Sequence, residues 1–219
     1  MTGGVPHVAA WKASRFDYLR EHQEEARGFD AMMANFPDNR HAAIAETYNF
    51  AAASVICDVG GGNGEALRKI LARNPKARGL LYDREDVVRA IGPSELMNGR
   101  IAPTAGSFFD SVPSGADIYM LVRVLHDWSD EDCVRILARC RDAMRTDAVL
   151  LVCDQVLDPD PSRALPTSYL VDTQMMAMFG AGRERTEQEF ADLLASCGLT
   201  LRALISTPSA VQILEVVPT

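Results

Sequence analysis

Several features that mark whole classes of protein are missing from this sequence. No apolar run reaches the roughly 18 residues that a membrane-spanning helix needs, so we expect no membrane partner. Residues 1–22 contain no long apolar core, so we expect no secretory signal there. Basic residues are also few: 22 Lys and Arg stand against 30 Asp and Glu, and a net charge of -8 argues against nucleic acid as a partner.

Histidine and cysteine are also scarce, and neither shows the spacing of a metal site. His7, His22 and His41 have no ligand spacing, so we expect no bound metal. The five cysteines are odd in number, form no CxxC pair and lie in apolar stretches. This pattern predicts buried, reduced thiols in a cytoplasmic protein and no disulfide framework. A small molecule is then the expected partner.

What the sequence does contain is an alternation of short apolar runs with amphipathic segments. Residues 14–50 are predicted to be helical, with a break at Pro37. The strands that we then expect are 54–59, 77–83, 100–107, 116–125, 148–157, 199–207 and 210–218, and the helices are 63–75, 84–92, 129–144, 167–180 and 186–197. We divide the chain into a helical extension at 1–51, which covers a substrate pocket, and a ligand-binding domain at 52–219.

Strands that alternate with helices predict a doubly wound α/β fold, with a parallel sheet covered on both faces. The last two strands are only a few residues apart, too few for a parallel crossover, so this pair is antiparallel. We therefore expect a seven-stranded, Rossmann-like sheet whose last strand is antiparallel. Capping boxes are predicted at Ser129 with Asp132 and at Thr186 with Glu189, and Gly198 is predicted to end the second of these helices.

Four polar features follow predicted strands, and they mark the expected site. Asp83, His126 and Asp154 each end a strand, and a glycine run follows Val59. Ligands of such sheets bind outside the carboxyl ends of the strands. We therefore expect these features to meet at one edge of the sheet.

The glycine run contains Gly60, Gly62 and Gly64 in the pattern G-x-G-x-G. A dinucleotide-binding loop has its third glycine one residue later, where the turn receives a pyrophosphate. Asp58 beside the turn would repel phosphate, whereas Asp83 stands where a carboxylate accepts ribose hydroxyls. An adenosine with a cationic tail fits better, as in S-adenosylmethionine; the alternative is a tight turn without a ligand.

The sequence resembles the S-adenosylmethionine-dependent small-molecule O-methyltransferases typified by plant caffeic acid O-methyltransferase and bacterial polyketide O-methyltransferases. The matching segments cover nearly the whole chain in order and are 29–33, 58–64, 82–83, 106–117, 125–133 and 182–190. Of these, HDWSDE and ERTxxEF are specific to the family, whereas many methyltransferases share the glycine loop. The resemblance implies O-methylation of a hydroxyl on a small aromatic or polyketide-like molecule, in secondary metabolism, by a class I methyltransferase fold.

The resemblance also implies roles for individual residues. His126 matches the general base, Asp154 takes the place of a glutamate that orients the base, and Glu184 matches a second such glutamate. We assign the cofactor, S-adenosylmethionine, to Asp58, Gly60, Gly62, Gly64, Asp83, Ser107, Phe108, Arg123 and Trp128, of which Phe108 and Trp128 flank the adenine. We assign the substrate to Phe29, Met33, Met175 and Phe179, where the two methionines pinch an aromatic ring.

Three departures from the family pattern lead to a further expectation. Ser107 replaces a usual aspartate, and Val122 replaces a frequent lysine. Family members also carry a helical N-terminal domain that makes the dimer, and this chain begins after it, as a fragment, a natural short form or one half of a split enzyme. We therefore expect weakened cofactor affinity, poor catalysis by this chain alone, and association with itself or with a separate chain, through Trp11, Phe16 and Leu19 left partly uncovered.

Other functions stay open at this point. A nicotinamide-dependent oxidoreductase is disfavoured by the glycine spacing. A degenerate methyltransferase fold that only binds a ligand or a partner chain would keep the same motifs. A magnesium-dependent catechol methyltransferase needs several converging carboxylates, and only Asp127 and Asp154 are obvious candidates.

Overall fold

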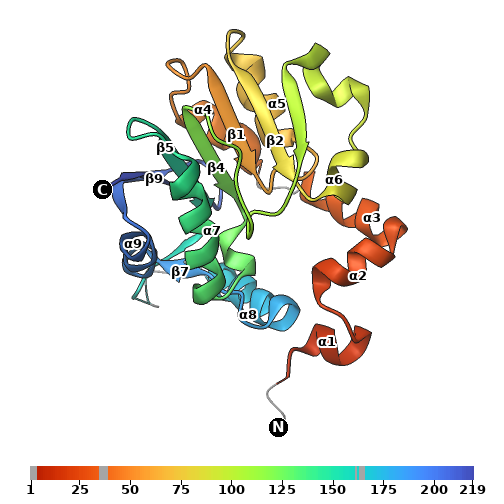
Figure 1. Cartoon of the computed structure of the whole chain (residues 1–219). Helices are drawn as coiled ribbons and strands as arrows, with labels where there is room; N and C mark the ends of the chain where they lie inside the picture. The colour runs from red at the N-terminus through yellow and green to blue at the C-terminus, as the bar shows by residue number, and fades with distance from the viewer. Residues whose placement is uncertain (1–3, 35–38, 161, 163–165) are drawn as a thin grey trace.

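The computed structural model describes residues 4–34, 39–160, 162 and 166–219, except the side chains of 30–34, 166 and 167. These residues form a seven-stranded sheet in the order β3-β2-β1-β4-β5-β9-β8 (Figure 1). Its strands are β1 (Val55–Val59), β2 (Arg78–Asp83), β3 (Ile101–Ala105), β4 (Ile118–Val122), β5 (Val149–Asp154), β8 (Leu199–Ser206) and β9 (Gln212–Pro218). The first five pair in parallel, and β9 runs antiparallel to β5 and β8. The predicted fold class is confirmed.

The main helices lie where the hydrophobic pattern placed them, but a break at His22 divides the first predicted helix. The helix at Pro6–Trp11 and the 3-10 helix at Pro93–Gly99 were not predicted. The helices are α1 (Pro6–Trp11), α2 (Arg15–Glu21), α3 (Gln23–Ala34), α4 (Arg40–Thr47), α5 (Glu65–Arg73), α6 (Glu85–Arg89), α7 (Asp130–Ala143), α8 (Pro166–Phe179) and α9 (Glu187–Ser196), with 3-10 helices η1 (Pro93–Gly99) and η2 (Leu125–Asp127). The predicted break falls between α3 and α4, although Pro37 itself lies outside the described residues. No helix in the described part of the chain is both long enough and apolar enough to cross a membrane.

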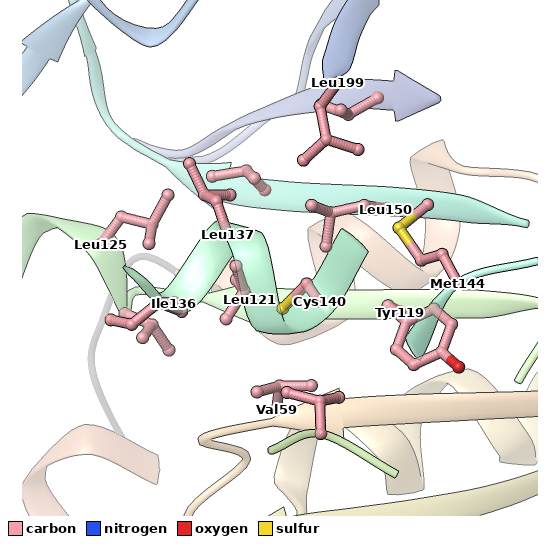
Figure 2. Close-up of a cluster of buried hydrophobic side chains, with 14 of the residues drawn as sticks. Val59, Tyr119, Leu121, Leu125, Ile136, Leu137, Cys140, Met144, Leu150 and Leu199 are labelled. Carbon is pink, nitrogen blue, oxygen red and sulfur yellow. The ribbon is translucent and has the colours of Figure 1, made fainter. Parts of the chain in front are cut away.

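Each face of the sheet has its own apolar core, because successive side chains of a strand point to opposite faces. In β4, Tyr119 and Leu121 pack in the core under α7 and α9. Ile118 and Met120 of the same strand pack in the core with α4 and α5. Figure 2 shows the first core, in which side chains of β4, β5 and α7 point toward one another. Burial on both faces explains why these strands are continuous apolar runs in the sequence.

The hydrogen bonds confirm where α7 and α9 begin, but they form a reciprocal capping box at Thr186 with Glu189 and not at Ser129 with Asp132. Ser129 Oγ accepts the amide of Asp132 at 3.1 Å and begins α7. Thr186 and Glu189 form the reciprocal capping box of α9, and Gly198 follows its end at a φ of +66°. The five cysteines are all free, and all but Cys197 are buried.

Two predicted strands are shorter in the structure than in the sequence pattern. The strand expected at 116–125 ends at Val122, because Arg123 takes a left-handed φ of +55° that breaks the extended backbone. His126 therefore lies on η2, a single 3-10 turn, and not at a strand end. The strand expected at 148–157 divides into β5 and β6 (Val156–Leu157), and β6 pairs with β7 (Arg185–Thr186) in a small separate sheet.

Candidate active site

A cavity of about 720 Å³ opens at the carboxyl edge of the parallel strands, and we call it the central cavity. It lies where the strand order reverses between β1 and β4, the switch point at which doubly wound sheets bind ligands. Its volume is within the usual range for small-molecule sites, roughly 300–1,000 Å³. A neighbouring cavity of about 1000 Å³ shares Phe16, Trp128 and Phe179 with it.

The turn after β1 forms one wall of this cavity. Gly60 and Gly62 have left-handed φ values of +73° and +56°, which glycine adopts without steric cost. A Cβ on Gly60 would lie 3.0 Å from Val124 and 3.4 Å from Phe108, whereas a Cβ on Gly62 would meet open space. The turn is therefore closely packed at Gly60 and open to a ligand at Gly62.

Two carboxylates lie next to this turn in different environments. Asp83, the last residue of β2, accepts the amides of Gly62 at 2.8 Å and of Arg84 at 2.7 Å. Asp58 is only 1% exposed, and neither of its carboxyl oxygens has a hydrogen-bond partner among the described residues. Burial and the neighbouring Asp83 raise the pKa of Asp58 to about 7. Acidic groups in this position favour a cationic ligand and disfavour a phosphate.

Most of the predicted cofactor residues line the central cavity together. These are Gly60, Gly62, Asp83, Ser107, Phe108, Arg123 and Trp128. Asp58 and Gly64 do not line it: Asp58 lies beneath the turn, and Gly64 is buried where α5 begins. The Oγ of Ser107 accepts the amide of Phe109 at 3.2 Å, so this hydroxyl already has a local partner.

Aromatic side chains form a second wall around Trp128. Its ring packs edge-on against Phe108 at 5.8 Å and Phe109 at 4.8 Å between ring centroids. On the other side, Phe16 of α2 stacks on Trp128 at 5.8 Å and contacts Phe179 at 5.4 Å. The part played by Phe16 was not predicted, because its spacing in the sequence is that of an ordinary apolar helix face.

The predicted catalytic residues meet in one buried cluster, and Arg123 lies at its centre. His126 is buried, and its Nδ1 is 3.3 Å from Oε1 of Glu184. Arg123 donates to Glu184 at 2.8 Å and to Nδ1 of His126 at 2.9 Å. Asp154 lies 3.4 Å from Arg123, and the Nε2 of His126 lies 3.3 Å from Asp127. Asp154 thus contacts the imidazole only through Arg123.

Burial and fixed charges set the protonation of this cluster. Burial, together with the charge of Arg123, lowers the pKa of His126 to about 4. Burial alone would raise the pKa of Glu184, but its contact with His126 and the charge of Arg123 lower it to about 2. Burial raises the pKa of Asp154 to about 7 against the opposing effect of Arg123, and it raises that of Asp127 well above its usual value. At neutral pH the cluster therefore holds a neutral imidazole beside an ionised Glu184.

Although three carboxylates converge here, a guanidinium lies among them where a cation would bind. Among the described residues, no group of three His, Cys, Asp or Glu side chains could hold a metal ion. The arrangement is suited to proton transfer at an imidazole.

A buried arginine that the sequence did not single out holds this loop. Arg185 is fully buried and donates to the carbonyl oxygens of Leu125 at 2.9 Å and Trp128 at 2.8 Å. It also pairs with Asp130 at 2.7 Å. The only available signal was its place inside the ERTxxEF motif, which does not distinguish a supporting residue from a catalytic one.

The predicted substrate residues come from α3 and α8. Phe29, Met175 and Phe179 line the central cavity. Met33 is on α3, and its side chain is outside the part of the chain that the structure describes. Arg40, at the start of α4, is buried and also lines the cavity, although the sequence did not indicate it.

Comparison with known proteins supports a specific enzyme class. Residues 2–200 match the model of the O-methyltransferase domain. The chain is 34% identical over 220 residues to the phenazine O-methyltransferase PhzM of Lysobacter antibioticus, covering 99% of this chain and 64% of that protein. It is 37% identical to the mitomycin biosynthesis 6-O-methyltransferase of Streptomyces lavendulae, over 98% of this chain and 62% of the relative. The chain thus spans less than two thirds of the length of these relatives.

Solved structures show the same similarity in three dimensions. The crystal structure of LaPhzM superposes with a TM-score of 0.93 at 32% identity, over 100% of this chain and 66% of that one. NcsB1, an O-methyltransferase from neocarzinostatin biosynthesis, superposes with a TM-score of 0.89 at 31% identity, over 100% and 65%. That structure contains S-adenosylmethionine and 2-hydroxy-5-methyl naphthoic acid.

Proposed function

The chain belongs to the O-methyltransferase domain family, and we propose that it transfers the methyl group of S-adenosylmethionine to a hydroxyl of a small aromatic or polyketide-like molecule. The main support is one arrangement: the acidic glycine turn and His126 border the same cavity. A methyl donor and a proton acceptor placed so close together match the needs of alkylation at an O–H group.

The residues of the turn fit the proposed cofactor. The open side of Gly62 admits a close ligand, and Asp83 is placed at the carboxyl end of β2 for ribose hydroxyls. The aromatic rings of Phe108 and Trp128 offer flat apolar surfaces for the adenine. Asp58 and Asp83 make the turn attractive to positive charge. When bound, S-adenosylmethionine supplies an activated methyl group on a sulfonium that leaves as a neutral thioether.

In this proposal, His126 is the general base that takes the proton of the substrate hydroxyl. A lowered pKa keeps its imidazole neutral at physiological pH, as a base requires. Glu184 contacts the imidazole and holds its orientation, whereas Asp154 acts on it through Arg123. The oxygen then bonds to the methyl carbon as the carbon–sulfur bond breaks, and the proton stays on the imidazole.

The substrate wall supports an aromatic acceptor. Phe29, Met175 and Phe179 present flat or adaptable apolar surfaces, and Met33 belongs to the same proposed set. The naphthoic acid bound in NcsB1 is a molecule of this kind. We also propose that residues 1–51 cover the pocket, since Phe16 and Phe29 reach its lining from α2 and α3.

We also propose that the chain associates with a second copy of itself or with a separate chain. Trp11 on α1 is 56% exposed and Leu170 on α8 is 69% exposed, and these two helices are in contact. Leu19, which was expected to be partly uncovered, is instead buried at 4% exposure. Light scattering of the purified chain tests the association, and a stable monomer with ordinary activity would refute it.

Calorimetry and an acceptor panel test the function itself. We expect binding of S-adenosylmethionine and S-adenosylhomocysteine, no binding of NAD, and methylation of at least one phenolic acceptor in mass spectrometry. Tight NAD binding without adenosylhomocysteine binding would establish the oxidoreductase alternative. Adenosylhomocysteine binding without turnover of any acceptor would instead favour a non-catalytic binding module.

A further inference from the structure

Arg123 occupies an unusual place for a long, charged residue. It follows β4 with a φ of +55°, while its amide continues the sheet by donating to the carbonyl of Cys153 at 3.0 Å. Such a backbone is uncommon outside glycine and persists only where the surroundings fix it. Its side chain is 8% exposed and points back into the catalytic cluster.

The guanidinium is bound from three sides. It faces both carboxylate oxygens of Glu184, at 2.8 and 3.3 Å, in the paired geometry that arginine favours. One nitrogen lies 3.4 Å from Asp154, and another lies 2.9 Å from Nδ1 of His126. The same nitrogen atom contacts both His126 and Glu184, so it stands between the imidazole and its carboxylate.

This contact fixes the proton of the imidazole. An arginine only donates hydrogen bonds and keeps its charge in proteins, so Nδ1 of His126 must accept. A neutral imidazole has one donor and one acceptor nitrogen. Its proton therefore belongs on Nε2, which lies 3.3 Å from Oδ1 of Asp127.

The acidic groups around His126 favour its protonated form, against the effect of burial. Glu184 and Asp127 face the ring directly, and Asp154 faces it through Arg123. On the α4 side, the charge of Arg40 disfavours the imidazolium. From α8, Asp172 approaches this region but accepts the amide of Glu184 at 2.9 Å. Arg123 thus brings a positive charge into contact with the ring among several acidic groups.

We propose that Arg123 is a positioning residue that keeps His126 neutral, with its proton on Nε2, by occupying the place between the imidazole and Glu184 that an imidazolium proton would fill. The effect of Arg123 on catalysis rests on the proposed function, whereas its effect on the protonation of His126 does not. In this tautomer Nε2 already carries a proton, so it can act as the base only after a tautomer exchange through solvent. In that exchange Nε2 releases its proton, the guanidinium leaves Nδ1, and Nδ1 takes up a proton that it donates in a hydrogen bond to Glu184, which is already 3.3 Å away.

The protonation claim can be tested by NMR without any activity. In protein labelled with ¹⁵N-histidine, the four histidines give separable signals, and a His126→Gln variant assigns the one of interest. We expect His126 to be neutral with its proton on Nε2 from pH 6 to pH 8 in the parent protein. We expect it to be an imidazolium at pH 7 in Arg123→Gln. An imidazolium at pH 6 in the parent protein would overturn the proposal, even if Arg123→Gln did not fold.

The catalytic consequence is tested by the pH dependence of kcat/KM. For Arg123→Gln we expect the acid limb of the profile to move from near pH 4 to above pH 7, so that kcat/KM falls at least twofold at pH 7 and recovers at alkaline pH. Arg123→Lys keeps the charge and should keep the limb near its original position. Arg183→Gln is the matched control, because Arg183 is next to Glu184 in the chain but pairs with Asp130 and Glu189. A uniform loss at every pH, with His126 still neutral, would mean that Arg123 only supports the fold. Absence of turnover in the parent protein would refute the proposed function and leave the NMR result valid.

Discussion

The amide of Gly62 donates a hydrogen bond of 2.8 Å to Oδ2 of Asp83, so the turn after β1 is tied to the last residue of β2. Gly62 can adopt its left-handed backbone because it is a glycine. Its hydrogen bond holds the carboxylate of Asp83 at the cavity wall. The two therefore form one structural unit, although 21 positions separate them in the chain.

Gly62→Ala should weaken cofactor binding at a modest cost to the stability of the fold. The left-handed backbone costs an alanine about 1–2 kcal/mol of unfolding free energy. The added methyl group projects into the open space beside the turn, where we expect the ligand, so adenosylhomocysteine affinity should fall at least tenfold by calorimetry. Gly115→Ala is the control, because its φ is +95°, its surroundings are open and it does not line the cavity. Equal affinities in the two variants would place the ligand elsewhere.

His126→Ala should reduce turnover without disturbing the cofactor. Loss of a general base typically costs roughly 10²–10⁴-fold in rate, while adenosylhomocysteine affinity should change less than about twofold because the turn is unaltered. Single-turnover methylation of a confirmed acceptor measures the first effect and calorimetry measures the second. His22→Ala, outside both cavities, should leave both values unchanged. Unchanged turnover in His126→Ala would show that alignment alone suffices.

Arg185→Met should destabilise the protein strongly. The substitution removes a charged donor from the carbonyls of Leu125 and Trp128, although the Leu125 carbonyl still accepts the amide of Trp128, and it should cost about 2–4 kcal/mol in urea unfolding. In contrast, Arg183→Met breaks half-exposed ion pairs on the same loop and should cost less than about 1 kcal/mol. Similar losses in the two variants would contradict the supporting role of Arg185.

Asp58→Asn should change how stability depends on pH. The folded protein raises the pKa of Asp58 to about 7 by burial, so the folded state holds a proton that the unfolded chain releases near pH 4. The stability that this proton contributes is present at pH 4 and is lost as the pH rises through about 7. Relative to the parent, the variant should therefore gain about 4 kcal/mol of unfolding free energy between pH 4 and pH 8. The control is Asp142→Asn, at an exposed carboxylate of α7. Its unfolding free energy relative to the parent should stay constant between pH 4 and pH 8.

Periodicity and turn chemistry were sufficient to predict the sheet and the edge at which the site lies. Asp83 and Asp154 do end their strands, and the last pair of strands is antiparallel, because these features depend on local apolar runs and on a connection too short for a crossover. The predicted end of β4 was three residues too late, at 125 in place of Val122. Nothing in the run from 118 to 125 is unfavourable in a strand. Arg123 has its left-handed backbone where its side chain contacts Glu184 and Asp154, which are distant in the sequence.

The same reason explains which site residues the sequence missed. Arg123 was assigned to the cofactor, and it does line the cavity, but its charged end contacts Asp154 and Glu184, the carboxylates of the proposed catalytic cluster. Arg185 and Phe16 act through tertiary contacts to η2 and Trp128. Local patterns predict which strand edge holds a site, whereas the pairing of buried charges across the site depends on the folded geometry.

Trp128 gives the protein an optical consequence. The chain has two tryptophans, of which Trp11 is largely exposed and Trp128 forms part of the cavity wall between Phe16 and Phe108. Indole emission shifts with the polarity of its surroundings. A ligand that displaces water from Trp128 would therefore shift the emission to shorter wavelength. With Trp11→Phe, the remaining emission would come from inside the site itself, and binding could be followed in real time without an attached dye.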